Sequence, residues 1–147
     1  MVIVTSIIVL AGAVLFAFFT TGFPPSVQAH GAGVELNRRE FAGPYEVALG
    51  IVPDPPALGE IAITLAVIEK QARAVVMDAN VTLVGAGPNT AQLGPLIVET
   101  DPVDPTFYDL RTSLNHAGAW IFTVNIDAPA GQGSADFTIA VGENNSL

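Results

Sequence analysis

The chain begins with an uncharged apolar run over residues 2–19. As an α-helix this run would be about 27 Å long at 1.5 Å per residue, close to the hydrocarbon thickness of a bilayer, about 30 Å. Pro24 and Pro25 follow the run, and proline does not continue a helix because it lacks the backbone N–H. The sequence therefore predicts a transmembrane anchor or signal segment over residues 1–23, with residues 2–23 meeting the lipid bilayer.

This segment is compatible with two fates. Small residues at Val27 and Ala29 form a signal-peptidase site, and cleavage after Ala29 would make His30 the new N-terminus. However, no Lys or Arg precedes the run, and the run is longer than the apolar region of a usual signal peptide. Both alternatives stay open: a single-pass protein with its domain on the extracytoplasmic side, periplasmic or outer, or a secreted or periplasmic protein cleaved at Ala29.

Small residues lie in the middle of the apolar run, at Ala11, Gly12 and Ala13. Small side chains let a neighbouring transmembrane helix approach closely. If the segment stays uncleaved, these three residues are the expected contact with a partner helix, and membrane protein subunits are the expected partners.

Composition limits what the rest of the chain can do. All fourteen acidic and all five basic residues follow the apolar run, which gives a net charge of −9. An acidic domain repels phosphate, so nucleic acid is not an expected partner. The chain has no cysteine, which excludes disulfides and thiolate chemistry. We expect a Pro/Gly stalk over residues 24–32, one domain over residues 33–142, and a short tail over residues 143–147.

Apolar residues alternate with polar ones along this domain, and turn residues recur at short intervals. A period of two is typical of half-buried strands, and strands spaced 8 to 12 residues apart are typical of a β-sandwich. The fold class predicted is therefore all-β, an immunoglobulin-like β-sandwich of seven or eight strands behind one N-terminal transmembrane helix. The expected strands are 34–36, 45–51, 61–67, 80–84, 96–98, 107–114, 119–126 and 137–141. The expected core residues are Tyr45, Leu65, Trp120, Phe122 and Phe137.

Several turn and core residues follow a known order. It consists of GPYEV at residues 43–47 leading to Pro53, Gly59 opening an apolar strand, Tyr108 before a strand, and AGAW at residues 117–120 before another. Over about 100 residues this order resembles the extracytoplasmic domain of the FixH and YtkA-like proteins. The resemblance implies a small secreted or anchored module of the kind found beside membrane respiratory and metal-handling systems. It does not imply an enzyme.

The two histidines, His30 and His116, suggest a possible copper site. A free N-terminal His30 would offer an amine and an imidazole to Cu(II), and His116 could complete the site with a carboxylate from Glu35, Asp109 or Asp127. This placement is similar to that of CopC-type copper carriers. Unlike them, the chain has no second His or Asp two residues from His116. The alternative is that His30 is a polar stalk residue and His116 a turn residue.

Acidic residues cluster at Glu99, Asp101, Asp104 and Asp109, but their spacing is not that of an EF-hand, so a solvated acidic loop is expected. No residue pattern indicates a catalytic site, and we expect no enzyme. The function predicted is a non-catalytic accessory or interaction subunit of a membrane protein complex, without a cofactor. The alternative is an exported copper-binding carrier that uses His30 and His116.

Overall fold

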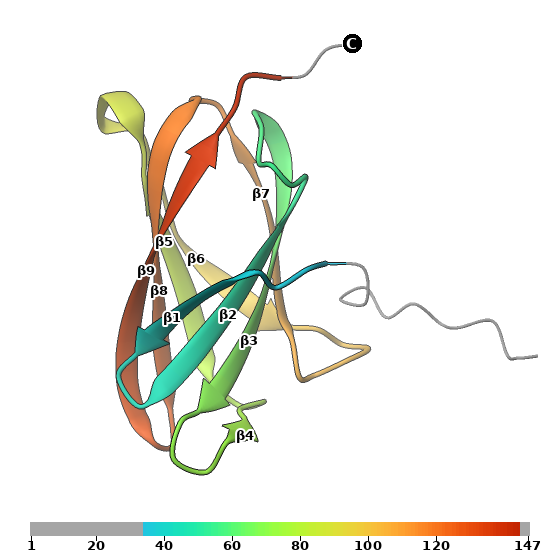
Figure 1. The fold of residues 1–147 in the computed structure, drawn as a ribbon, viewed down its shortest axis with the longest axis vertical. Coiled ribbons are helices and arrows are strands. Elements are labelled where there is room, and N and C mark those ends of the chain that lie inside the picture. The colour runs from blue at the N-terminus through green and yellow to red at the C-terminus, as the bar shows by residue number, and fades with distance from the viewer. Residues whose placement is uncertain (1–33, 145–147) are drawn as a thin grey trace, which may run out of the picture.

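A computed structural model describes residues 34–144, which form an antiparallel β-structure with one short 3-10 helix (Figure 1). The predicted anchor and stalk, including Ala11, Gly12, Ala13 and His30, lie outside the described residues. Within residues 34–144 no helix is long and apolar enough to cross a membrane. The elements are β1 (Arg38–Ala42), β2 (Tyr45–Val52), β3 (Gly59–Glu69), β4 (Ala74–Val75), β5 (Asn80–Ala86), η1 (Pro88–Thr90), β6 (Gln92–Thr100), β7 (Tyr108–Leu114), β8 (Gly118–Ala128) and β9 (Gly131–Val141).

The strands form one nearly closed sheet in the order β1-β2-β3-β7-β6-β5-β8-β9, and the two-residue strand β4 pairs with β3. Strand β6 joins the two halves, because its first part pairs with β5 and its end, at Glu99 and Thr100, pairs with β7. The first and last strands of the path, β1 and β9, come close to each other without hydrogen bonds between strands (Figure 1). The all-β prediction is confirmed, with an additional strand, β4, that was not expected.

Two glycines allow β1 to approach β9. The Cβ of a side chain at Gly133 in β9 would overlap the carbonyl oxygen of Ala42 in β1. Gly43, which follows β1, has a φ of +56°, which glycine adopts readily, and a Cβ there would be 2.7 Å from the carbonyl oxygen of Gln132. The β1–β9 contact therefore requires glycine at both positions.

The core lies between the two halves of the sheet and is built from alternate residues of each strand. Trp120 in β8 is 2% exposed, and its Nε1 donates to the carbonyl oxygen of His116 at 2.9 Å. Its ring lies so close to Gly87 that a Cβ there would be 2.5 Å away, and the centroid of Phe122 is 6.0 Å from that of Trp120. The residues expected in the core are all buried: Tyr45, Leu65, Trp120, Phe122 and Phe137.

The first strand differs from its prediction. Residues 34–36 were expected as a strand, but residues 34–37 pair with no strand and lie across β2, and the first strand is β1. A Cβ at Gly50 would be 2.6 Å from Cγ1 of Val34 and 2.9 Å from Cδ2 of Leu36. The apolar residues that suggested a strand therefore cover the outer side of β2 at Gly50.

The last strand is longer than predicted. Residues 129–133, which contain Pro129 and two glycines, were expected as a loop, and the last strand was expected only at 137–141. In the structure β9 pairs with β8 along its whole length, from Gly131 opposite Ala128 to Val141 opposite Gly118. Residues 131–136 have a weak preference for strands, but pairing with the long strand β8 holds them in the sheet.

Candidate functional site

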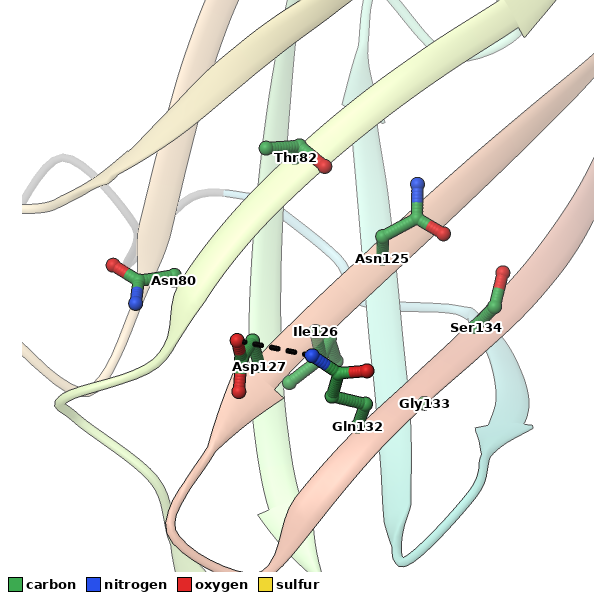
Figure 2. Close-up of a pocket in the computed structure, with 8 residues that line it drawn as sticks. All are labelled: Asn80, Thr82, Asn125, Ile126, Asp127, Gln132, Gly133 and Ser134. Atoms are coloured by element: carbon green, nitrogen blue, oxygen red, sulfur yellow. Dashed lines mark hydrogen bonds between the residues drawn. The ribbon is translucent and has the colours of Figure 1, made fainter.

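The outer face of β5, β8 and β9 carries hydrogen-bonding side chains in register (Figure 2). One cross-strand row holds Asn80, Asp127 and Gln132, and the next holds Thr82, Asn125 and Ser134. Each row takes one residue from each of the three strands. Because side chains of a strand alternate between its two faces, these six lie on the side opposite the core. We call these six residues the polar face.

Few of these side chains are engaged with each other. Nε2 of Gln132 donates to Oδ2 of Asp127 at 3.2 Å, the contact drawn in Figure 2. Within residues 34–144 the side chains of Asn80, Thr82 and Asn125 form no hydrogen bond with another protein group, and neither does that of Ser134. Their amide and hydroxyl groups are thus available to a binding partner.

The polar face lines a shallow, open depression of about 600 Å³. Part of its floor is formed by Gly133, which has no side chain to fill the space between its neighbours. Two exposed apolar residues lie on the same side of the sheet: Ile97 of β6 pairs with Thr82 and is 73% exposed, and Ile121 of β8 is 46% exposed. The surface therefore combines uncharged polar groups with two aliphatic side chains.

Charge is distributed unequally between the two halves of the sheet. Every Lys and Arg lies on β1, on β7 or in the turn after β3. Three of them form ion pairs at 3.5, 2.7 and 3.3 Å: Arg38–Asp54, Arg39–Glu46 and Arg111–Glu60. Strands β5, β6, β8 and β9 carry Glu99, Asp127 and Asp136 and no basic residue. The half that bears the polar face is thus acidic.

The residues considered for copper are not brought together by the described part of the chain. His116 lies in the turn between β7 and β8, where its Nδ1 is 2.7 Å from Oδ1 of Asn115. Asp127 is at the opposite end of β8, and Oδ1 of Asp109 in β7 accepts from Thr64 at 2.7 Å. Residues 34–144 hold no group of three or more possible metal ligands. Because His30 lies outside the described residues, the copper prediction stays untested.

The acidic loop between β6 and β7 has a structural use. Asp101 is 2% exposed, and its Oδ1 accepts from the backbone N–H groups of Val103 at 2.6 Å and Asp104 at 3.0 Å. Oδ1 of Asp104 in turn accepts from the N–H of Thr106 at 3.1 Å. By accepting hydrogen bonds from N–H groups two or three residues further along the chain, these carboxylates fix the conformation of the turn.

Tyr108 makes a long-range connection that the residue pattern did not predict. Its hydroxyl donates to the carbonyl oxygen of Val76 at 2.7 Å and accepts from the N–H of Ala79 at 3.1 Å. It thereby fastens the segment before β5 to the start of β7. Burial raises the pKa of Tyr108. The hydrogen bond from Ala79 lowers this pKa by a smaller amount, and the negative charge of Asp78, the weakest of the three effects, raises it. The only sequence signal was a tyrosine directly before a strand.

No family model matches the sequence, and no curated protein matches it either. The resemblance to the FixH and YtkA-like proteins is therefore not confirmed.

Two solved structures are similar to the chain. A DUF4426 family protein from Pseudomonas aeruginosa PAO1 has a TM-score of 0.58 at 13% identity, over 74% of this chain and 99% of that one. The soluble domain of PmoD from Methylocystis sp. ATCC 49242 (Rockwell) has a TM-score of 0.47 at 18% identity, over 71% of this chain and 96% of that one. The second score is too low to carry an argument. The first shows that the chain shares its β-fold with a protein of distant sequence.

Proposed function

We propose that this protein is a non-catalytic accessory subunit of a membrane protein complex, with an extracytoplasmic domain held at the membrane by residues 2–23. In this proposal the domain is an immunoglobulin-like β-sandwich of the FixH and YtkA kind, and it binds another subunit through the polar face. The apolar run in the sequence supports the anchor, and the chemistry of the polar face supports the contact.

The observation that carries the proposal is the uncharged centre of the polar face. The centres of protein interfaces are depleted of charged residues, and interfaces contain about one hydrogen bond per 100–200 Å². Asn80, Thr82, Asn125 and Ser134 supply uncharged donors and acceptors in a compact group, next to the exposed Ile97. Exposed apolar surface rimmed by polar groups is typical of protein interaction sites.

Attachment to the membrane would make a modest contact sufficient. Two sites tethered within the same membrane or complex meet at an effective concentration in the millimolar range, so weak individual contacts yield stable association. With the domain held at the membrane, a small open surface such as the polar face is sufficient to bind a partner subunit. The anchor and the face would then act together.

The test is a charge substitution in the middle of the polar face. In the full chain purified from its native membrane, Asn125→Arg should strongly reduce the subunits that copurify, because it places an unpaired cation in the proposed contact. Ser113→Arg on β7 is the matched control, since Ser113 is exposed on the other half of the sheet, opposite Glu60. A complex that retains the Asn125→Arg protein at full occupancy would exclude this face.

The anchor has a separate test. Deletion of residues 2–23 should release the protein from the membrane and from its complex. If the truncated protein stays in the complex at full occupancy, the N-terminal segment is not needed for association.

A further inference from the structure

The last strand, β9, has a free edge. It pairs with β8 on one side, and no strand of residues 34–144 pairs with it on the other (Figure 1). Its neighbour there, β1, lies close to it without pairing, and Ala42 at the end of β1 meets Gly133 near the beginning of β9. An unpaired edge presents a row of backbone N–H and C=O groups to which another strand can bind.

The direction of these groups follows from the residue after the strand. The N–H of Gly142 donates to the carbonyl oxygen of Pro56 at 2.9 Å, and its own carbonyl accepts from the N–H of Leu58 at 3.0 Å. Gly142 therefore points away from β8. Because successive residues of a strand point their backbone groups to opposite sides, every even-numbered residue of β9 points away from β8 as well.

The other end of the strand agrees with this assignment. A Cβ at Gly43 would be 2.7 Å from the carbonyl oxygen of Gln132, so this even-numbered residue also directs its carbonyl toward β1 and away from β8. Between the part covered by β1 and the part covered by the β2–β3 loop, four residues direct backbone groups to the open side. They are Ser134, Asp136, Thr138 and Ala140.

The side chains of these four residues are exposed on the outer face, because the odd-numbered residues fill the core. Asp136 lies in the middle and bears the only charge among them, and its Oδ1 accepts from Thr123 at 2.7 Å. On the open side the nearest strand, β1, carries Arg38 and Arg39, which form ion pairs with Asp54 and Glu46. No Lys or Arg lies on β5, β6, β8 or β9. A cation placed opposite Asp136 would meet no repulsion from a basic residue of these strands.

We propose that the edge of β9 from Ser134 to Ala140 binds an extended segment of a partner protein, which adds a strand to the sheet and places a Lys or Arg opposite Asp136. This proposal rests on the proposed function and names the kind of partner segment involved. Backbone hydrogen bonds supply affinity in such strand addition, and the side chains opposite supply specificity. Residues directly opposite each other have Cβ atoms about 4.5–5.5 Å apart, within reach of a Lys or Arg side chain.

A second copy of the chain is a less suitable occupant. Each chain carries a net charge of −9, and pairing of two β9 edges would bring two copies of Asp136 near each other with no basic residue between them. Like charges near each other across a strand pair are destabilising. Charge complementarity therefore favours a basic segment from another protein.

The test uses the isotope-labelled full chain in detergent micelles and a synthetic peptide. The peptide, Lys-Thr-Val-Lys-Val-Thr-Lys, is extended, β-prone and basic at its centre, and its control has Glu in place of the central Lys. Binding is measured by amide chemical shifts and amide hydrogen exchange. At millimolar peptide, the amides of Ser134, Asp136, Thr138 and Ala140 should shift and exchange more slowly, and the Glu peptide should bind about fivefold more weakly.

Two variants examine the edge itself. Thr138→Pro removes an N–H that points to the open side, which leaves the hydrogen bonds to β8 intact, so it should fold and lose most of its peptide binding. Thr138→Val keeps the N–H and should bind as the unmodified protein does. Equal binding by Thr138→Pro, equal affinity for the two peptides, or no shift in β9 at millimolar peptide would each overturn the proposal.

Two further outcomes distinguish strand addition by a basic partner from pairing with a second copy of the chain and from binding through the polar face alone. If the β9 amides shift with protein concentration alone, the occupant is a second copy, and the proposal of a basic partner is wrong. If Thr138→Pro keeps the native complex but Asn125→Arg loses it, the proposed function stands and the strand addition does not.

Discussion

Substitution of the chain's two tyrosines by phenylalanine should have unequal effects on stability, although both rings are fully buried. The hydroxyl of Tyr108 serves two backbone groups, the carbonyl of Val76 and the N–H of Ala79. That of Tyr45 serves one, donating to the carbonyl of Gly131 at 2.9 Å. Gly131 is exposed, so its carbonyl can bind water after the substitution, whereas Val76 and Ala79 are partly buried.

The magnitudes follow from these partners. One intramolecular hydrogen bond contributes about 0.5–1.5 kcal/mol net, and leaving a buried partner unsatisfied costs about 1–3 kcal/mol. Tyr108→Phe should therefore lower the free energy of unfolding by about 2–3 kcal/mol, and Tyr45→Phe by about 1 kcal/mol. Urea unfolding followed by the fluorescence of Trp120 measures both. Equal costs for the two variants, or a cost below about 0.5 kcal/mol for Tyr108→Phe, would refute the role of the Tyr108 hydroxyl.

The pKa of Tyr108 adds a dependence on pH. Burial raises this pKa above its ordinary value of 10.0, so above that pH the unfolded chain loses its tyrosine proton while the folded chain keeps it. The stabilising contribution is complete below pH 10.0 and is lost as the pH rises through the folded pKa. Stability should fall in this range for the unmodified protein and less steeply for Tyr108→Phe. Titration of the ultraviolet absorbance of tyrosinate measures the pKa directly. If Tyr108 titrates at its ordinary value, the predicted rise in its pKa is wrong.

The remaining predictions concern the core, the surface and the histidines. Trp120→Ala should cost about 3–5 kcal/mol because the ring is buried; urea unfolding followed by circular dichroism measures this, and an unchanged midpoint would contradict it. Gly87→Ala should cost about 1–3 kcal/mol, measured in the same way, because its Cβ would overlap the Trp120 ring. Arg39→Ala should change stability by at most about 1 kcal/mol, since its ion pair with Glu46 is exposed. If the intact mass of the native protein begins at His30, Cu(II) titration should show weaker binding in His116→Ala; unchanged binding would exclude His116 as a ligand.

The sequence predicted most of the strands because their apolar residues alternate. In β3, for example, Ile61, Ile63 and Leu65 are all buried on one face, as a period of two requires. It failed where covering segments matter. Val34 and Leu36 alternate as a strand would, yet they lie across β2 at Gly50 and pair with nothing. Alternating apolar residues show that one side of a segment is buried. They do not show whether the segment pairs with a strand or lies across one.

The candidate site was not predictable in the same way. Asn80, Asn125 and Ser134 are far apart in the sequence, and each alone is an ordinary polar residue on a strand. They become one surface only because β5 pairs with β8 and β8 with β9. The histidines, which are rare in the chain and therefore conspicuous, drew the prediction toward metal binding. Rare residues are visible in a sequence, whereas a surface of common residues appears only once the strand order is known.

The free edge of β9 illustrates the same limit in a sharper form. Ala135, Phe137 and Ile139 alternate with polar residues, which identifies the core-facing side of the strand, but an edge strand and a central strand with one solvated face have this same pattern. Edge position depends on whether β1, the first strand, hydrogen-bonds with β9, the last. It does not: the two strands lie close together, with Ala42 against Gly133, but no strand pairing joins them. The row of backbone groups from Ser134 to Ala140 is therefore unpaired, and the charge of Asp136 is the feature within that row that can select a partner.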